Sequence, residues 1–425
     1  MKKLLILVFI CLIITACDSS YSSGKGSYSD HNSDRVVSGL SQGNDMPGKY
    51  AGTMPFYMDE FGEMDNFEDA NNLINATRNS NIPELNELIT KGVNIDAQDE
   101  EGDTALIYAT QYNLMDIFDL LLDKGANVNI RNNYGDTALS YAAQYGREEM
   151  SKKLIDKGAS VNVKDKANNT ILMKAAQKGN VEVIKLLLEA KADVNAKQEY
   201  DHTALSAANN PEVVKLLIDA GADVNIATKE ANETPLIYNA KNGQTEIVKL
   251  LIEAGADVNA RNLIKNTALI EAIPTKKIEI IKILIDAGAN VNVKGEGRNT
   301  PLMYATQYGW IEAARLLTEK GADVNAGNRY GTTALMLAAE QGNISIARLL
   351  IDKGADINAK DETGSTPLIK AAQKGNNAMI NLLLTSGADI NAKDDYGINA
   401  LLAASERKLT ETIKLLLDFG ASVNN

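Results

Sequence analysis

Apolar and polar positions alternate along most of this chain in blocks that each contain two short amphipathic stretches. In one block, an apolar stretch from Ile171 to Ala176 is followed by a Lys-Gly-Asn break and by a second apolar stretch from Val181 to Glu189. Apolar residues three or four positions apart predict two short helices. A polar segment with turn-forming residues precedes the next block, which predicts a hairpin connection.

The blocks follow one another at a nearly constant step. Each first helix is preceded by a threonine that has a leucine two positions later, and the step between these threonines is 33 residues in eight of nine cases, counting to Asn399, and 31 residues in one. A repeat of this size indicates a solenoid, in which small units stack to bury their apolar faces. The pattern therefore predicts one elongated all-α domain. The threonines are Thr104, Thr137, Thr170, Thr203, Thr234, Thr267, Thr300, Thr333 and Thr366.

Each unit carries signals for the ends and contacts of its helices. Threonine is a good N-cap, and Pro235, Pro301 and Pro367 occupy the first helical position, where proline loses no hydrogen bond. Alanine pairs in the first helix permit close packing, and leucine pairs in the second helix face the stack. Glycine after the second helix supplies a left-handed residue. Those glycines are Gly125, Gly158, Gly221, Gly255, Gly288, Gly321, Gly354, Gly387 and Gly420.

The repeated Gly-Ala-Asp-Val-Asn at 221–225 and 255–259, a glycine-containing turn and Thr-Pro-Leu closely resemble the ankyrin repeat family. The resemblance covers residues 67–425 as ten clear units and a degenerate first unit, about eleven helix-turn-helix units with short hairpin connections. It implies a curved array whose concave side holds a protein partner. With packed helices about 10 Å apart, the array is on the order of 100 Å long.

The N-terminus has the features of a secretory signal peptide over residues 1–16. Lys2 and Lys3 precede an apolar run that is too short to cross a bilayer, and Ile14-Thr15-Ala16-Cys17 resembles the lipobox of bacterial lipoproteins. That resemblance implies that Cys17 becomes the lipid-modified first residue and that the protein is extracytoplasmic, attached to a bacterial membrane. A secreted protein cut after Ala16, or an uncleaved anchor, is the alternative. Asp18 resembles the inner-membrane retention signal of enteric lipoproteins, which is not general, so the leaflet stays open.

Residues 17–66 are expected to tether the array to the membrane. The part up to about Lys49 is rich in Ser, Gly, Asp and Asn, which is typical of a flexible linker with a mean reach of about 30 Å. The apolar residues between 50 and 66 are expected to pack against the first repeat, with a partner-binding segment as the alternative.

Charge and cysteine content restrict the partners. The formal charge is −13, and it becomes −15 when Lys2 and Lys3 leave with the signal peptide, so binding to nucleic acid or anionic lipid is not expected. Cys11 lies in the removed segment and Cys17 would carry lipid, which leaves no thiol for a disulfide or a metal.

No pattern in the sequence favours catalysis. The two histidines, His31 and His202, are isolated, and there is no nucleophile elbow or phosphate-binding loop. Asp193, Asp223 and Asp257 recur in register, as do Asp323 and Asp356, which indicates a structural role. We therefore predict no enzymatic activity, no cofactor and no metal site.

Aromatic residues at variable positions are the candidate partner-binding residues. Tyrosine and tryptophan are favoured as interface anchors because they combine a large contact area with a polar group. One set lies on the hairpins and another near the end of the first helix, although each could merely pack on its neighbouring repeat. The candidates are Tyr112, Tyr134, Tyr145, Tyr200, Tyr308, Trp310, Tyr330 and Tyr396. In contrast, Tyr108, Tyr141, Tyr238 and Tyr304 occupy a position typical of leucine and are expected in the core.

Among the hairpins after the first, seven carry a basic residue six positions before the helix-opening residue, and five carry an acid two residues after that position. We expect these bases to pair with the acids inside solvated hairpins, while a groove for an anionic partner is the weaker alternative. The bases are Arg131, Lys164, Lys197, Arg261, Lys294, Lys360 and Lys393; the acids are Glu199, Glu230, Glu296, Glu362 and Asp395.

The repeats between residues 196 and 299 are irregular. They contain the 31-residue step, Pro274 inside a first helix, and non-glycine residues at the turn position, among them Lys265 and Arg298. Lysine and arginine tolerate the left-handed conformation poorly. Sequence drift is the simpler explanation; the functional one is that this block changes the curvature and shapes the main partner site.

The sequence thus predicts a membrane-anchored protein that binds one or more proteins through its concave face. A structural spacer of the envelope and a surface-displayed protein that binds host proteins are the alternatives.

Overall fold

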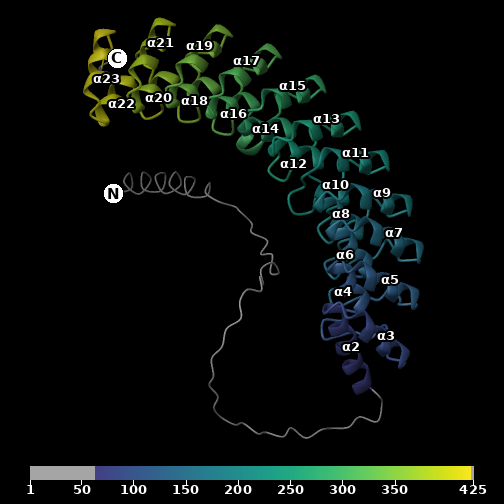
Figure 1. The fold of residues 1–425 in the computed structure, drawn as a ribbon. Coiled ribbons are helices and arrows are strands. Elements are labelled where there is room, and N and C mark those ends of the chain that lie inside the picture. The colour runs from purple at the N-terminus through teal and green to yellow at the C-terminus, as the bar shows by residue number, and fades with distance from the viewer. Residues whose placement is uncertain (1–62, 423–425) are drawn as a thin grey trace, which may run out of the picture. The chain divides into compact units, whose positions relative to one another are not determined.

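A computed structural model describes residues 63–422 of the chain. The predicted signal peptide, Cys17 and residues 17–62 of the predicted tether lie outside the described residues. The described part consists of eleven pairs of antiparallel helices stacked in one curved row (Figure 1), which confirms the predicted all-α repeat solenoid and its count of units.

The first helices of the pairs form an inner row on the concave side of the curve (Figure 1). They are α2 Glu63–Arg78, α4 Ala105–Gln111, α6 Ala138–Tyr145, α8 Ile171–Lys178, α10 Ala204–Ala207, α12 Pro235–Lys241, α14 Ala268–Ala272, α16 Pro301–Gln307, α18 Ala334–Gln341, α20 Pro367–Lys374 and α22 Ala400–Glu406.

The second helices form the outer row. They are α3 Ile82–Thr90, α5 Met115–Asp123, α7 Glu148–Asp156, α9 Val181–Glu189, α11 Pro211–Asp219, α13 Thr245–Glu253, α15 Ile278–Asp286, α17 Ile311–Glu319, α19 Ile344–Asp352, α21 Asn377–Thr385 and α23 Thr410–Asp418. Two 3-10 turns, η1 Ile273–Thr275 and η2 Glu296–Arg298, belong to the irregular centre.

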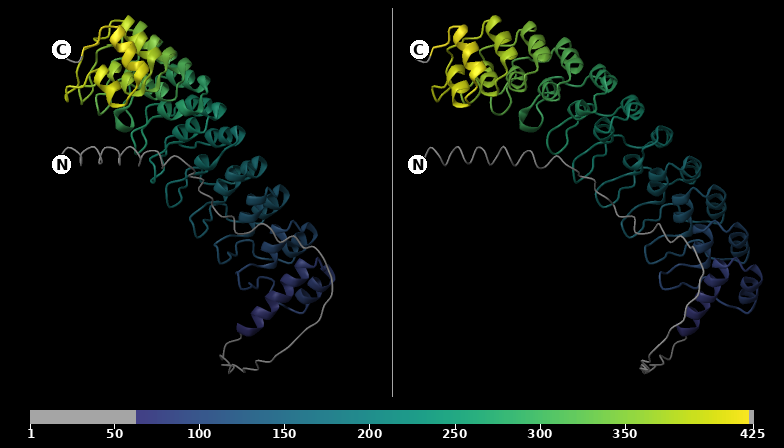
Figure 2. Two further views of the ribbon diagram at one scale, coloured as in Figure 1. Left: turned by 90° about the vertical axis from the view of Figure 1, so that its left-hand side faces the viewer. Right: turned by 60° about the vertical axis from the view of Figure 1, so that its left-hand side comes forward.

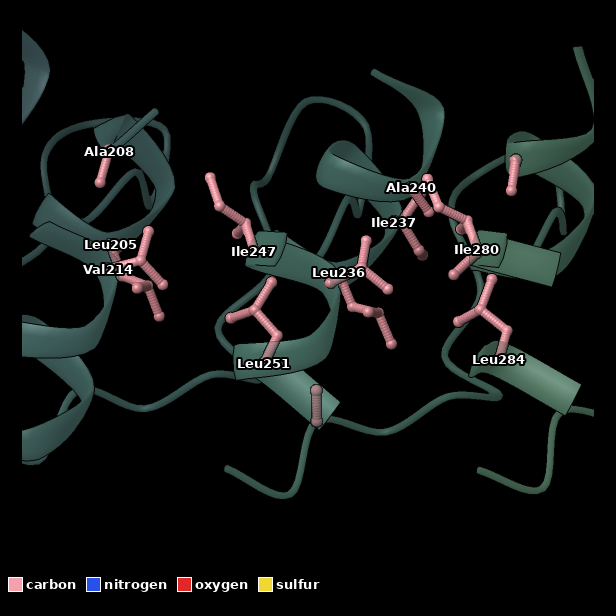
Figure 3. Packing of buried hydrophobic residues seen from close by; sticks show 14 of the residues in the cluster. Leu205, Ala208, Val214, Leu236, Ile237, Ala240, Ile247, Leu251, Ile280 and Leu284 are labelled. Carbon is pink, nitrogen blue, oxygen red and sulfur yellow. The ribbon is translucent and has the colours of Figure 1, made fainter. Parts of the chain in front are cut away.

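The core is a continuous layer between the two helix rows. Figure 3 shows its centre, where Leu236 of an inner helix and Leu251 of an outer helix are fully buried beside Leu284 of the next unit. Alanines such as Ala142 and Ala175 are also fully buried in the inner row. Burial of this apolar surface, at roughly 25 cal/mol per Å², is the main stabilising term of the stack.

The predicted helix caps are present. Eight of the nine marker threonines accept a hydrogen bond from the backbone N–H three residues later, as Thr104 does from Ile107, and so does Asn399. Thr267 is the exception: its hydroxyl is buried and accepts no such bond. This exception lies in the irregular block.

Asparagine side chains join each unit to the next. Asn225 Oδ1 accepts from the backbone N–H of Asp257 (2.8 Å), and its Nδ2 donates to the carbonyl of Gly255 (3.4 Å). Equivalent bridges to the next unit are made by Asn129, Asn162, Asn195, Asn259, Asn292 and Asn325. The aspartates predicted to be structural cap the intervening turns, as when Asp223 accepts from the N–H of Asn225 (2.9 Å). These aspartates therefore fix the turns from which the asparagine side chains bridge to the next unit.

The hairpins are held by turn hydrogen bonds. In the described residues the β-pairing is limited to an isolated bridge between Lys164 and Thr170. The hairpins project together from one edge of the helix stack (Figure 2).

The centre departs from the regular pattern as the sequence predicts. Helix α10 has four residues, and α14 stops at Ala272, where Pro274 and its neighbours form the η1 turn. Lys265 and Arg298 have φ values of 68° and 62°, in the left-handed region. Lys191, at a helix end where other units have glycine, has a φ of 65°.

Candidate interaction surface

Three exposed tyrosines, the inner-helix tyrosines, lie at the ends of inner helices. Tyr145 is the last residue of α6, and Tyr112 and Tyr308 directly follow α4 and α16. The Tyr112 ring stacks on Tyr108, with centroids 6.0 Å apart, and the Tyr145 ring stacks on Tyr141, at 6.4 Å. Because Tyr108 is buried against the core and Tyr141 packs on it, they restrict the motion of the two exposed rings. A partner that binds these rings would lose little side-chain entropy on binding.

Four further exposed tyrosines, the hairpin tyrosines, lie on the hairpins: Tyr134, Tyr200, Tyr330 and Tyr396. In each, the backbone N–H donates to the side-chain oxygen two residues earlier, over 2.9–3.1 Å. Arg329 lies over the Tyr330 ring, 4.7 Å from its centroid. The turn geometry therefore fixes where these side chains leave the backbone.

Two aromatic residues lie where the sequence did not predict them. Trp310, a candidate partner-binding residue, directly precedes α17, is only 7% exposed and belongs to the core. Tyr238 was expected in the core but is 48% exposed. Helix α10, which precedes its helix α12, is too short to cover it.

Two exposed aliphatic residues were missed by the sequence analysis. Leu263 and Ile264 lie on the hairpin before Thr267 and are 65% and 47% exposed. Ile264 occupies the same position in its unit as Tyr134 does in its own, so a search of that position for any large apolar side chain, rather than for aromatic ones, would have found it.

The predicted pairing of hairpin bases with hairpin acids is wrong where the structure gives their contacts. Lys164 Nζ donates to the carbonyl of Lys197, and Lys360 Nζ to that of Lys393, both at 2.9 Å. The Arg131 guanidinium likewise donates to the carbonyl of Lys164. These three bases therefore join one hairpin to the next. Because their N–H groups already donate to backbone carbonyls of the array, the alternative of a groove for an anionic partner is weakened.

A buried polar network connects the first hairpins to the inner helices. Asn132 Nδ2 donates to Asp103 Oδ1 (2.8 Å) and to the Tyr141 hydroxyl (3.1 Å). Next to it, Lys174 Nζ lies 2.6 Å from Asp136 Oδ1 and 2.9 Å from Asp165 Oδ2. Burial raises the pKa of Asp103 to about 6, although the bond from Asn132 opposes this, and Asp99, Glu101 and Asp136 add further repulsion.

Asp103→Asn is therefore expected to stabilise the fold at pH 7.5 by about 1–2 kcal/mol and to change it little at pH 4. The folded-state pKa of Asp103 lies above its unfolded value of about 3.9, so stability falls as pH rises between these two values. The amide keeps the oxygen that accepts from Asn132. Urea unfolding of both proteins at the two pH values measures the difference; an equal gain at both would show that ionisation of Asp103 is not the cause.

Neither a metal site nor a membrane-spanning helix emerges from the residues that the structure describes. No three His, Cys, Asp or Glu side chains between residues 63 and 422 converge as metal ligands. Over the same residues, the helices are too short or too polar to cross a bilayer. His202 lies beside Ser206, with Nδ1 3.4 Å from the hydroxyl, which is a contact within one turn of the chain.

A comparison with protein-family models agrees with the repeat pattern. A family model described as ankyrin repeats, in three copies, matches residues 73–165, 152–228, 202–295, 293–361 and 359–425. The crystal structure of an ankyrin repeat domain from Acinetobacter baumannii AYE, at 1.00 Å resolution, is 35% identical, with a TM-score of 0.42; the match covers 44% of this chain and 98% of that one. No curated protein is similar enough to be matched.

Proposed function

Because this chain belongs to the ankyrin repeat family, whose members are generally non-enzymatic modules for protein interaction, we propose that it binds one or more proteins through its concave face. The observation that carries the proposal is the set of inner-helix tyrosines, which are exposed on an otherwise well-packed row of helices. Tyrosine is enriched among the residues that dominate binding energy at interfaces. Stacking on Tyr108 and Tyr141 restrains two of the three rings before any partner arrives.

The second part of the proposal is that a lipid on Cys17 holds the array at the extracytoplasmic face of a bacterial membrane. It rests on the basic, apolar and lipobox-like segments at the N-terminus. Replacing Cys17 with serine is expected to abolish the incorporation of labelled palmitate and to release the protein from membranes. Protease treatment of whole cells separates display on the surface from a periplasmic location.

Partner binding is tested by replacing the three inner-helix tyrosines together. We expect Tyr112→Ala, Tyr145→Ala and Tyr308→Ala to reduce partner capture at least tenfold, since anchor residues cost 2 kcal/mol or more when truncated. The partner is captured by crosslinking in envelope fractions and identified by mass spectrometry. The matched control replaces the same residues with phenylalanine, which keeps the rings and is expected to retain most binding.

The alternatives give different results in the same experiment. A structural spacer would lose nothing in the alanine variant, provided that its circular dichroism and unfolding curve match the unchanged protein. Capture of host proteins by intact cells, lost in the alanine variant, would instead support a surface-displayed binder.

A further inference from the structure

Large and small side chains alternate along the row of hairpins from the second hairpin to the last. We number the hairpins 1 to 10 in chain order, so that hairpin 1 precedes Thr104 and hairpin 10 precedes Asn399. In each hairpin we compare the residue that lies three positions before the helix-opening threonine, or before Asn399 in the last one. The even-numbered hairpins carry Tyr134, Tyr200, Ile264, Tyr330 and Tyr396. Hairpins 3, 5, 7 and 9 carry Ala167, Ala231, Gly297 and Thr363. With units about 10 Å apart, a large side chain stands about every 20 Å.

The alternating side chains are held on fixed backbone. The carbonyl of Tyr134 accepts from the N–H of Lys166 in the next hairpin (2.8 Å), and Tyr200 and Tyr330 make the equivalent bonds at 3.0 and 2.9 Å. All five large side chains are nonetheless exposed, Tyr396 to 75%. The row therefore presents exposed large side chains on hydrogen-bonded backbone, with a small side chain between each two of them.

Charge along the middle of the row is divided in the same ordered way. Hairpins 4 and 5, residues 197–202 and 228–233, carry a combined formal charge of −2, and hairpins 6 and 7, residues 261–266 and 294–299, carry +3. Glu199 and Glu230 on the acidic side are exposed, as are Lys265 and Arg298 on the basic side. The boundary between the two signs falls between hairpins 5 and 6, which is also the middle of the row.

We propose that the hairpin row binds a second copy of this chain, antiparallel and edge to edge, around a twofold axis between hairpins 5 and 6. This axis places hairpin 5 against hairpin 6, 4 against 7, 3 against 8 and 2 against 9, so that every large side chain among them faces a small one. It also sets the acidic pair of hairpins against the basic pair twice. The outer pairs lack this charge match: hairpins 1 and 10 are both acidic, at −4 and −1, and hairpins 3 and 8 each carry +1. At hairpins 1 and 10 the size pattern also fails, because Tyr396 meets the larger Glu101.

A second copy fits this surface better than an unrelated protein because a twofold contact uses one patch twice, and the two rows have the same spacing and curvature. Half-exposed side chains of this size contribute on the order of 100 Å² each, so the five of them supply roughly 500 Å² per copy. A stable interface needs about 800 Å² per partner, and the surrounding hairpin backbone can provide the remainder. The exposure of Leu263, beside the axis, is then accounted for.

The pairing is tested by charge exchange between two tagged copies of the full chain expressed together. The first variant carries Lys265→Glu and Arg298→Glu, and the second carries Glu199→Lys and Glu230→Lys. None of these four side chains has a hydrogen bond or ion pair with another element except Glu230, whose carboxylate lies 4.0 Å from His202 Nε2. Circular dichroism verifies that each variant is folded.

We expect the unchanged chain to co-purify with its tagged copy, and each variant to lose at least tenfold of that signal when paired with itself, because like charges then oppose each other. The first variant paired with the second should recover it, since every opposed pair regains opposite signs. Membrane attachment is common to all combinations and cannot produce this pattern. The inner-helix alanine variant should co-purify normally, which separates this proposal from the proposed function.

Three results would overturn the proposal. One is that the unchanged chain does not co-purify with its tagged copy. This includes the case in which the hairpin substitutions reduce the capture of a different protein. The second is self-pairing of the variants at the unchanged level. The third is loss in both variants without recovery in the mixed pair, which would rule out the antiparallel register.

Discussion

Replacing Trp310 with alanine is expected to lower the free energy of unfolding by about 3–5 kcal/mol, the range for removal of a buried aromatic side chain. The indole is 7% exposed and lies among core residues that include Ala314 and Leu317, both fully buried. Its removal leaves a cavity between the two helix rows. Urea unfolding followed by circular dichroism measures the change, since Trp310 is the only tryptophan and its fluorescence is lost in the variant.

Trp310→Phe is the matched control, and a loss of only about 1 kcal/mol is expected because the ring still fills much of the space. The opposite role for Trp310, an exposed anchor for a partner, makes a different prediction. In that case alanine would change the stability by no more than about 0.5 kcal/mol, as surface substitutions do, while partner capture would fall. The two measurements together decide between core and surface.

The fold could be predicted from the sequence because its signals repeat. A single Thr-Pro-Leu or Gly-Ala-Asp is weak evidence, but the same offsets recurring at 33 residues fix the helix starts, the helix ends and the stacking of units. The irregular positions were also predictable in physical terms. Pro274 ends its inner helix, and the turn position is left-handed even where it carries Lys265.

The surface was harder to predict, since side-chain direction at a loop position is set by neighbours in other units. Trp310 was assigned to the groove as an aromatic residue at a variable position. Leu114 and Leu409 occupy the same register and pack against the core, but other units carry polar residues there, such as Lys277, so the register alone did not indicate burial. Tyr238 was assigned to the core from its register alone. Its exposure depends on the shortness of α10 in the preceding unit.

The side-chain hydrogen bonds that join one unit to the next could not be predicted from the residue types alone. The hairpin bases were expected to meet nearby acids, whereas Lys164 and Lys360 reach a backbone carbonyl 33 residues further along. A carbonyl has no signature in the sequence, so only the stacking geometry reveals it. The same holds for the asparagine bridges, in which Asn225 bonds the backbone of the next unit.

Replacing the left-handed Lys191, Lys265 and Arg298 with glycine is expected to stabilise the array by about 2 kcal/mol in total. A left-handed conformation costs an ordinary residue about 1–2 kcal/mol. Glycine removes this cost, but it also increases the conformational entropy of the unfolded chain, so the net stabilisation is roughly 0.5–1 kcal/mol per site. No hydrogen bond or ion pair of the three side chains offsets their strain in the part of the chain described. The sites are separated enough for the gains to add.

The reciprocal substitution at Gly158 supplies the control for this strain. Gly158 has a φ of 87°, and a Cβ built there would meet nothing within 4 Å, so Gly158→Lys introduces left-handed strain without a clash. Gly158→Lys should destabilise the protein by as much as Lys191→Gly, in the next unit, stabilises it. Urea unfolding measures both changes. A triple variant that is no more stable than the unchanged protein would contradict strain at these sites. A stabilised variant that binds its partner less well would mean that the irregular block keeps its strained turns for recognition.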